Sequence, residues 1–322
     1  MLVLSRRDVE AALDPDLLVT AVAAAMADLS AGTGSFPNRT GADVAEVGGV
    51  LIAMPAYVAG AGALAAKLVA MFPQNAARGL PTHRAIVAAF DPETGTPEAV
   101  MDGEAVTAMR TAACSALSAR LLAREDASVL AVLGTGVQAR SHAELVRRAR
   151  PIEEVRIAGR DTAKVAALAA ELGAVPAASF EEAIAGAGIV CACTHSAEPV
   201  VRGEWLDPGT HVTSVGFNPQ GREIDAEALA GALVVVESRA AALAPYPAGS
   251  NDLLWPIRDG VFGADHVDTE IGELVSGAKP GRTRPDQVTI YKSVGVAAQD
   301  AAAAALVLRA ARERGLGTEV EI

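Results

Sequence analysis

From Ala127 onward the chain alternates short apolar segments with segments of helical periodicity. Helix patterns cover residues 137–149, 162–172 and 180–185. The apolar segments before, between and after them read VLAVLG, VRIAG, AVPAA, IVCAC, HVTSVG, LVVVE and TIYKSVG. Short, mostly apolar strands that alternate with helices are typical of a parallel sheet covered on both faces. The pattern therefore predicts a doubly wound α/β domain over residues 126–294.

The N-terminal part has a different pattern, which indicates an α+β layer. Ser5 with Asp8 matches a capping box, and Asp14 before Pro15 marks a second helix start. Strands are predicted for the apolar segments GVLIAM, ALAAKLVAMF, RAIVAAF and PEAVM. The turn sequence at 91–95 joins the last two as a hairpin, so a mostly antiparallel sheet is expected.

Two further helices flank the doubly wound region. Residues 107–123 predict a long helix with Thr107 as its cap, and residues 296–314 predict an Ala-rich helix. A helix as apolar as the second must be buried, so we expect it to leave the sheet domain and pack on the N-terminal part. The result is a discontinuous α+β substrate-binding and dimerisation domain, residues 1–125 and 295–322.

Composition excludes several classes of protein. Hydrophobic residues make up 51% of the 322 residues and charged residues 20%, which is enough apolar material to exclude a disordered chain. The net charge of −12 argues against a nucleic-acid partner, because such proteins need clustered positive charge. The uncharged stretch 48–66 contains Pro55 and several glycines, so it predicts strands and turns rather than a membrane span.

Targeting, redox and metal signals are also missing from the sequence. Charged residues interrupt the N-terminal apolar segment before a signal-peptide core forms. Three cysteines without a CxxC pair favour a cytoplasmic protein with no disulfide framework. No spacing of histidines or acids indicates a metal site.

A glycine-rich loop follows the first strand of the doubly wound region. Residues 129–133 run directly into Gly134-Thr135-Gly136-Val137-Gln138-Ala139, a GxGxxA pattern between a strand and a helix. Gly134 permits the tight turn, Gly136 lets the backbone approach a pyrophosphate, and Ala139 allows close packing of helix and strand. This context favours a Rossmann dinucleotide site over a simple tight turn.

The next strand ends in Gly159-Arg160-Asp161, where the adenosine ribose is expected. An acid at the strand tip accepts bonds from a free 2′-hydroxyl, whereas Gly159 and Arg160 leave room and charge for a 2′-phosphate. The residues favour NADP(H) over NAD(H), although Asp161 lies near enough to support NAD(H). The alternative is a surface arginine at a turn.

Three cations interrupt apolar segments of the N-terminal part. Only four of the 27 cations are lysines, and one of them, Lys67, lies in ALAAKLVAMF. Buried lysine is rare without a partner, so Lys67 is either an edge-strand residue that reaches solvent or a functional cation. Arg39 and Arg110 lie in similar surroundings, and arginine suits a bidentate grip on carboxylate. Together they predict a small anionic substrate facing the nicotinamide.

Over nearly its whole length the chain resembles the ornithine cyclodeaminase/μ-crystallin family. The resemblance rests on the Arg39 segment, Lys67, LPTH, FDPETG with MDG, TAMRTAA, LGTGVQA, SVGFNPQGRE and YKSVGVAAQD, in that order. It implies a homodimer built from an N+C substrate domain and a Rossmann domain. It also implies hydride transfer between a nicotinamide and the α-carbon of an amino or imino acid.

The resemblance also implies residue roles. Arg39 and Lys67 would hold the substrate carboxylate, and Arg110 would lie at the junction of substrate and cofactor. Further positions correspond to contacts of the family with its dinucleotide: Thr82, Val137, Gln138, Thr194, Ser214, Val215, Arg222 and Ser293. His83 lies beside this set, but a lone histidine near a turn is more often structural.

Asn218 departs from the family pattern. True ornithine cyclodeaminases carry an aspartate needed for ring closure in the segment after VG, and Asn218 takes that catalytic position here. A neutral amide cannot accept a proton, which weakens the cyclodeaminase hypothesis. Phe217 is expected to fill part of the pocket that a long amino side chain needs. The alternative for Asn218 is a turn residue before Pro219.

Three hypotheses for the function follow. The leading one is NAD(P)H-dependent reduction of an α-imino (ketimine) carboxylate to the L-amino acid, or the reverse dehydrogenation. Lys67 would bind the carboxylate and keep the imine nitrogen protonated, because an iminium accepts hydride better. The alternatives are an ornithine cyclodeaminase with bound NAD and a non-enzymatic protein that binds a small ligand. The presence of Lys67, Arg39 and Arg110 together favours a catalyst.

Overall fold

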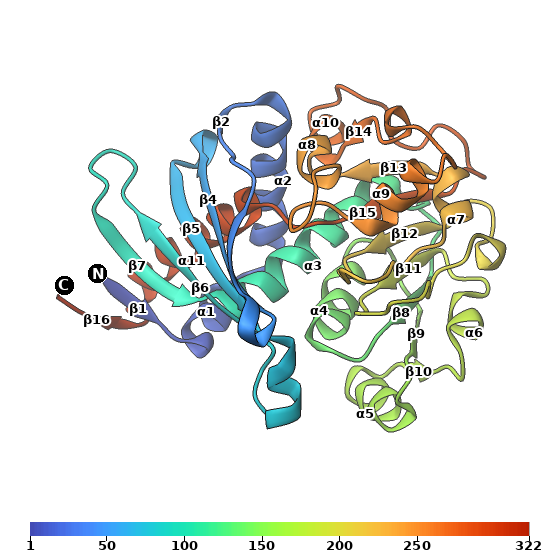
Figure 1. The fold of residues 1–322 in the computed structure, drawn as a ribbon, viewed down its shortest axis with the longest axis horizontal. Coiled ribbons are helices and arrows are strands. Elements are labelled where there is room, and N and C mark those ends of the chain that lie inside the picture. The colour runs from blue at the N-terminus through green and yellow to red at the C-terminus, as the bar shows by residue number, and fades with distance from the viewer. Residues whose placement is uncertain (322) are drawn as a thin grey trace. The chain divides into compact units, whose positions relative to one another are not determined.

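The computed structural model describes residues 1–321 and contains two compact units (Figure 1). The first unit is Met1–Arg110 with the C-terminal segment from Val296, and the second unit is Thr111–Gly295. The first boundary thus lies at 110/111 rather than at the expected 125/126, and the second at 295/296 rather than 294/295. The difference arises because the C-terminal half of helix α3 (Gly103–Leu122) is hydrogen-bonded within the second unit.

An eight-stranded sheet forms the centre of the second unit, in the order β10-β9-β8-β11-β12-β15-β13-β14. All its strand pairs are parallel. The strands are β8 (Val129–Leu133), β9 (Glu154–Ala158), β10 (Val175–Pro176), β11 (Ile189–Ala192), β12 (His211–Ser214), β13 (Leu233–Val236), β14 (Thr269–Glu270) and β15 (Thr289–Lys292). The chain moves from β8 outward to β10, then returns to β11 on the other side of β8. This reversal confirms the doubly wound prediction.

The helices of this unit follow the predicted alternation. They are α4 (Val137–Val146), α5 (Thr162–Leu172), α6 (Phe180–Ile184), α7 (Ala226–Ala230), α8 (Arg239–Ala242), α9 (Asn251–Arg258) and α10 (Ile271–Val275), with short 3₁₀ turns η4 (Gly203–Trp205) and η5 (Ala264–His266). Helix α4 ends three residues before the expected end, Ala149. The amides of Arg148 and Ala149 bond to carbonyls three residues back, and Pro151 follows, so the α-helix tightens and stops.

The first unit holds the second sheet, in the order β16-β1-β7-β6-β5-β4-β2, with β3 also paired to β4. The strands are β1 (Leu2–Leu4), β2 (Gly34–Ser35), β3 (Thr40–Val44), β4 (Gly49–Val58), β5 (Ala63–Met71), β6 (His83–Phe90), β7 (Pro97–Asp102) and β16 (Thr318–Glu319), joined in part by 3₁₀ turns η1 (Ala45–Val47), η2 (Ala59–Ala61) and η3 (Pro73–Arg78). Apart from the parallel β1–β7 pair, the pairs are antiparallel, as predicted. The N-terminal strand β1 pairs with β16, so both chain ends lie at one sheet edge (Figure 1).

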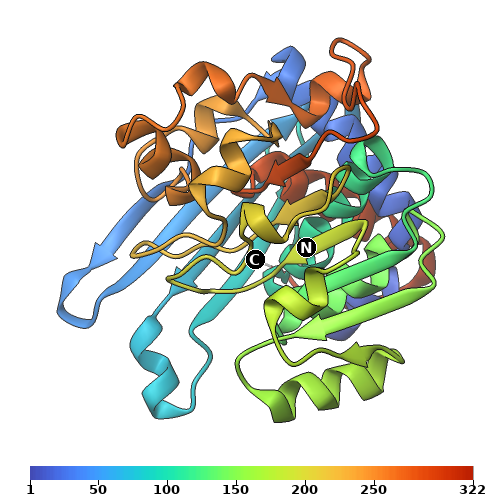
Figure 2. The ribbon, with the colours of Figure 1, turned by 90° about the vertical axis from the view of Figure 1, so that its right-hand side faces the viewer.

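Three helices cover one face of this sheet: α1 (Arg6–Ala12), α2 (Pro15–Ala31) and α11 (Ala297–Arg314). The Ser5–Asp8 capping box starts α1, and the Asp14 carboxylate caps α2, as the sequence predicts. Helix α11 packs on β4, β5 and β6 and against α2, which confirms the expected return of the C-terminal helix. Figure 2 shows the long strands of the sheet, with the β3–β4 hairpin and η3 projecting beyond its end.

Helix α3 begins at Gly103, so the predicted start and cap at Thr107 are wrong. Asp102, the last residue of β7, accepts a hydrogen bond from the Ala105 amide at 2.7 Å and acts as the cap instead. A Cβ at Gly103 would lie 2.7 Å from the Ala85 carbonyl carbon, so the helix starts in close contact with β6. In the part of the chain that the structure describes, no helix is long and apolar enough to cross a membrane.

Candidate active site

Lys67 lies in the middle of β5 and is only 3% exposed. The strand's alternation places it on the same face as Ala65 and Val69, toward the side that α11 covers. Its Nζ lies 2.8 Å from Oδ2 and 3.0 Å from Oδ1 of Asp300 on α11, and 3.5 Å from the Thr107 hydroxyl. The lysine is therefore buried and paired, so it does not reach solvent along an edge strand.

Arg110 contacts the same carboxylate from helix α3. Its Nε lies 2.9 Å from Asp300 Oδ1, and its guanidinium donates to the Gln299 side-chain oxygen at 2.7 Å. Arg110 is 5% exposed. We call Lys67, Arg110 and Asp300 the cation cluster. Arg39 precedes β3, is half-buried, and lies near enough for its charge to act on Lys67. The structure thus brings the three predicted cations together.

The cation cluster carries more positive than negative charge. Lys67 and Arg110 contribute two positive charges against one negative charge from Asp300. Burial of an uncompensated charge is costly in a medium of low dielectric constant. A monoanionic ligand, such as a carboxylate, would complete the balance and would gain charge-assisted hydrogen bonds.

The surroundings change the proton affinity of this cluster. Burial, followed by the positive charge of Arg110, lowers the pKa of Lys67 from 10.5 to about 8, although the Asp300 carboxylate acts in the opposite direction. Burial alone would raise the pKa of Asp300, but the adjacent Arg110 and Lys67 charges lower it below its usual value. A lysine with a pKa of about 8 can both donate and accept a proton near neutral pH.

In the second unit, the loop between β8 and α4 has the features of a pyrophosphate site. Gly134 has φ +122°, and a Cβ there would lie 2.6 Å from the Cys193 carbonyl oxygen, so only glycine fits. Gly136 is the N-cap of α4 and has open space where a Cβ would lie, and Val137 is exposed. The side-chain oxygen of Gln138 is buried without a hydrogen-bond partner among the described residues.

These features fit a bound dinucleotide. The loop lies at the carboxyl end of β8, next to β11, where the strand order reverses and where such sheets bind ligands. The first amides of a helix attract phosphate, and α4 begins at this loop. An unpaired buried polar atom is costly unless a ligand satisfies it, which applies to Gln138.

The end of β9 carries the predicted adenosine-site residues. The Asp161 carboxylate accepts from the amides of Ala163 and Lys164 and caps α5, so its role is structural. Arg160 is exposed and forms no ion pair with any residue in the described range 1–321. A Cβ at Gly159 would lie 3.0 Å from a Thr135 methyl group, so a larger residue would crowd this position. The arginine side chain is available for a ligand.

The remaining predicted cofactor residues of the second unit follow β11, β12 and β15. Thr194 and Ser214 both donate their hydroxyls to Glu223, at 2.7 Å each. The Ser293 hydroxyl donates to Glu237 at 2.5 Å. Backbone bonds hold the Val215 and Arg222 amides to the carbonyls of Ala192 and Ala197, respectively. These residues therefore lie at the carboxyl ends of neighbouring parallel strands or in the loops that follow them.

Asn218 lies in the loop after β12, and both the oxygen and the nitrogen of its side-chain amide form hydrogen bonds. Its oxygen accepts from the Gln220 amide at 2.8 Å, and its nitrogen donates to the His195 carbonyl at 3.2 Å. Phe217 stacks on Tyr246 with ring centroids 6.1 Å apart. These contacts match the turn-residue alternative for Asn218.

Two predicted positions lie in the first unit, before and at the start of β6. Thr82 is exposed, and its carbonyl accepts from the Phe72 amide at 2.8 Å. His83 is half-buried; burial, followed by the positive charge of Lys67, lowers its pKa below 6.5. The cofactor contact of Thr82 thus stays a prediction, and His83 lies near enough to Lys67 for that charge to lower its pKa.

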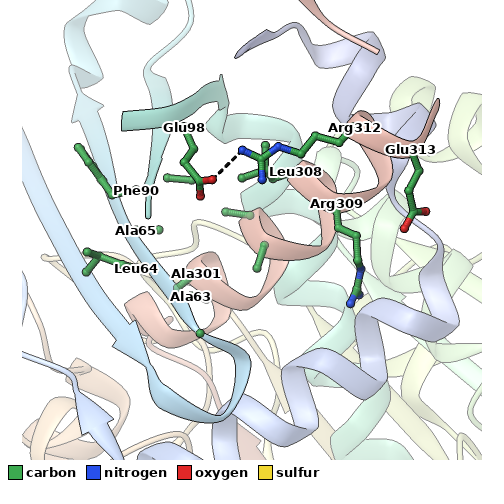
Figure 3. A pocket seen from close by; sticks show the side chains of 14 residues that line it. Ala63, Leu64, Ala65, Phe90, Glu98, Ala301, Leu308, Arg309, Arg312 and Glu313 are labelled. Carbon is green, nitrogen blue, oxygen red and sulfur yellow. Dashed lines mark hydrogen bonds and ion pairs between the residues drawn. The ribbon is translucent and has the colours of Figure 1, made fainter. Parts of the chain in front are cut away.

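A pocket of about 320 Å³ also lies in the first unit, between β5 and α11 (Figure 3). Alanines such as Ala63, Ala65 and Ala301 line it, and so do Arg312 and Glu98, which form an ion pair at 2.6 Å. It contains none of the predicted site residues. Most of its lining residues are glycine, alanine, leucine or phenylalanine, so it does not have the character of the active site.

The sequence of this chain is similar to those of known proteins. The model of the ornithine cyclodeaminase/mu-crystallin family matches residues 1–315. The chain belongs to this family. The ketimine reductase mu-crystallin of Mus musculus is 39% identical over 297 residues, which cover 90% of this chain and 91% of that protein.

Two solved structures extend the similarity to the fold. Delta(1)-pyrroline-2-carboxylate reductase of Thermococcus litoralis, solved with NADH and L-proline, has a TM-score of 0.93 and 35% identity, covering 99% of this chain and 100% of that one. An archaeal alanine dehydrogenase dimer with bound NAD has a TM-score of 0.92 and 31% identity, covering 100% and 99% of the two chains.

Several functional candidates of this family member were not singled out from the sequence. Asp300 pairs with both cations of the cation cluster, and Glu223 and Glu237 accept hydrogen bonds from the loops after the central strands. Asp300 had a usable signal, since it is an acid within an otherwise apolar stretch of the last helix. Glu223 and Glu237 look like ordinary surface acids in the sequence, although they are 2% and 0% exposed. Among residues 1–321, no group of three or more His, Cys, Asp or Glu side chains is arranged to hold a metal ion.

Proposed function

We propose that this protein is an NAD(P)H-dependent oxidoreductase that reduces an α-imino (ketimine) carboxylate to the L-amino acid, and that catalyses the reverse dehydrogenation. The observation that carries the proposal is the buried cation cluster, which has excess positive charge and a lysine with a pKa of about 8. The names of its relatives, a ketimine reductase and a pyrroline-2-carboxylate reductase, indicate a cyclic imine as substrate.

The substrate carboxylate binds to the cations of the first unit. Arg39 and Arg110 supply guanidinium donors, and the Lys67 ammonium supplies a point charge. Lys67 also keeps the imine nitrogen protonated during reduction, and accepts that proton in the reverse direction. Asp300 holds the Lys67 ammonium and the Arg110 guanidinium in place, since it contacts both.

The dinucleotide, when bound, supplies the hydride that reduces the imine carbon. The amides at the start of α4 bind its pyrophosphate, and the buried Gln138 oxygen accepts a hydrogen bond from a hydroxyl or amide N–H group of the dinucleotide. NADP(H) is preferred because Arg160 is free to bind a 2′-phosphate, while Asp161 is committed to capping α5. The loops of Thr194, Ser214 and Ser293 border its nicotinamide half.

The cyclodeaminase and ligand-storage alternatives have less support. Asn218 cannot act as the base for ring closure, because its amide is neutral and both its ends bind the loop. A storage protein has no use for a buried lysine whose pKa lies near neutral pH. The cytoplasmic location expected from the cysteine pattern stays a prediction.

A homodimer is also proposed, through the sheet face opposite α11. Register places Ala53, Leu68 and Ile86 in one row across β4, β5 and β6, and Ile86 is 46% exposed. An exposed apolar sheet face is typical of an interface, and a second copy of this chain is the proposed partner. The similar archaeal alanine dehydrogenase is a dimer. Light scattering of wild type and Ile86→Glu tests this: the variant should be monomeric.

The test of the proposed function is an absorbance assay at 340 nm. Pyrroline-2-carboxylate, piperideine-2-carboxylate, and pyruvate with ammonia or methylamine are each supplied with NADPH and with NADH. Net consumption of reduced cofactor with a cyclic imine is expected. Conversion of ornithine to proline without net absorbance change, and no reaction with any imine, would instead identify a cyclodeaminase.

A further inference from the structure

Glu223 is a buried carboxylate that the proposed chemistry does not use. It is 2% exposed and lies between the loops that follow β11 and β12. One oxygen accepts from the Thr194 amide at 2.6 Å and hydroxyl at 2.7 Å. The other accepts from the Ser214 hydroxyl at 2.7 Å and the Gly216 amide at 2.8 Å. Four donors saturate the acceptor sites of an ionised carboxylate.

A second buried layer fixes Glu223 itself. The Asp252 carboxylate accepts from the backbone amides of Glu223 and Ile224 at 2.6 and 2.8 Å. Lys292 is fully buried and lies 3.0 Å from the other Asp252 oxygen. The same ammonium donates to the Ser214 hydroxyl at 2.9 Å and the Gly216 carbonyl at 2.7 Å. Three separate chain segments, at Glu223, Asp252 and Lys292, therefore form one buried network around the Ser214–Gly216 segment.

The loop after β12 packs too closely on Glu223 to move independently of it. A Cβ at Gly216 would lie 2.5 Å from the Glu223 carboxyl carbon and 2.5 Å from the Thr194 carbonyl oxygen. The loop after β12 thus packs its backbone directly on the carboxylate, and a shift of Glu223 must move it. Such saturated buried networks specify one arrangement of the groups they bind.

The position of these loops relates them to one half of the cofactor. The pyrophosphate loop follows β8, and the adenosine-site residues follow β9 on one side of it. Strands β11 and β12 lie on the other side of β8, so their loops border the nicotinamide half of a dinucleotide bound across the crevice. We propose that Glu223 is a positioning residue that holds the Thr194 and Ser214–Gly216 loops for the nicotinamide half of the cofactor. This inference rests on the dinucleotide binding proposed above.

The isosteric amide cannot replace this carboxylate. Hydroxyl groups can rotate, but each carboxylate oxygen also accepts from one fixed backbone amide, of Thr194 on one side and Gly216 on the other. In Glu223→Gln the new NH₂ group must face one of these N–H donors. One loop is then displaced, whichever way the amide is oriented.

The experiment compares two ligands on wild type, Glu223→Gln and the control Glu270→Gln. Glu270 is also a buried carboxylate of the second unit, but it binds the Arg239 amide near α8. Isothermal titration calorimetry measures the dissociation constants of NADPH and of 2′,5′-ADP, which lacks the nicotinamide half. If wild type binds NADH better than NADPH, NADH and 5′-ADP are used instead. Glu223→Gln should weaken the binding of NADPH roughly tenfold or more and leave the affinity for 2′,5′-ADP within about twofold of wild type. Glu270→Gln should change neither by more than about twofold.

Two results would overturn the positioning role of Glu223. Unchanged NADPH affinity in Glu223→Gln, or equal losses for both ligands, overturns the positioning role, because the second result indicates general damage to the unit. If Glu223→Gln does not fold, Glu223→Asp is titrated instead; it keeps the charge but is too short to reach both loops, and the same selective loss is expected. If wild type binds neither dinucleotide, the proposed function fails first.

Discussion

The Lys67 ammonium lies 2.8 Å from the Asp300 carboxylate, and both side chains are at most 3% exposed. The contact joins β5 to α11 through two residues that are 233 positions apart in the chain. Removing one partner of a buried ion pair leaves the other charge uncompensated, which typically costs about 3–5 kcal/mol. The pair therefore contributes to the fold of the first unit as well as holding the lysine for chemistry.

Lys67→Ala should abolish turnover and leave NADPH affinity within about twofold of wild type. The substitution removes the proton donor and one carboxylate contact, while the dinucleotide residues of the second unit are unchanged. Steady-state rates and NADPH titration check this, with the exposed Lys164→Ala as the matched control. An unaltered kcat in Lys67→Ala would remove the lysine from the mechanism.

The pH dependence of the two directions should be opposite. Burial lowers the pKa of Lys67 to about 8, so the protonated form needed for imine reduction is lost as pH rises through 8. The kcat/KM for reduction should fall above that pH, and the kcat/KM for dehydrogenation should rise. Profiles of both directions between pH 6 and 10 measure this. Two parallel profiles would contradict a proton-transfer role.

Stability should fall as pH decreases below 6.5. Burial lowers the pKa of His142 to about 4 and that of His211 to about 3, from 6.5, so the unfolded state takes up protons first. Each histidine should cost about 2 kcal/mol of the free energy of unfolding between pH 7 and pH 5. Urea unfolding at several pH values measures the slope, and His142→Gln should reduce it. Constant stability over this range would show that both rings titrate normally.

Arg160 should determine the choice of cofactor. Arg160→Ala is expected to raise the KM for NADPH about tenfold and to leave that for NADH unchanged, because only NADPH carries the 2′-phosphate. Arg258→Ala, which removes another exposed arginine of the second unit, is the control. If wild type already prefers NADH, or if Arg160→Ala affects both cofactors equally, the proposed NADP(H) preference is wrong.

Local signals in the sequence predicted much of the fold. The Ser5 and Asp14 caps start α1 and α2, and α5 has the predicted bounds because Asp161 caps one end and Gly173 ends the other. The predicted start of α3 was wrong because the residue that caps this helix, Asp102, is also the last residue of strand β7. Capping depends on a few adjacent residues, which explains why these errors are confined to element ends.

The candidate site was harder to predict where it depends on pairing across the chain. Lys67 and Arg110 were recognisable as cations in apolar segments, but their shared partner, Asp300, lies far along the sequence. Many acids were equally available to pair with them. Glu223 gave no signal, because its burial results from the loops that close over it.

The central claim is that hydride passes from the nicotinamide to the imine carbon, and isotope transfer tests it most directly. Pyrroline-2-carboxylate is reduced with NADPH deuterated at C4, in separate 4R and 4S forms, and the mass of the product amino acid is measured. One of the two forms should give proline with a single deuterium at the α-carbon. Proline without deuterium from both forms, or proline formed only from ornithine, would contradict the account.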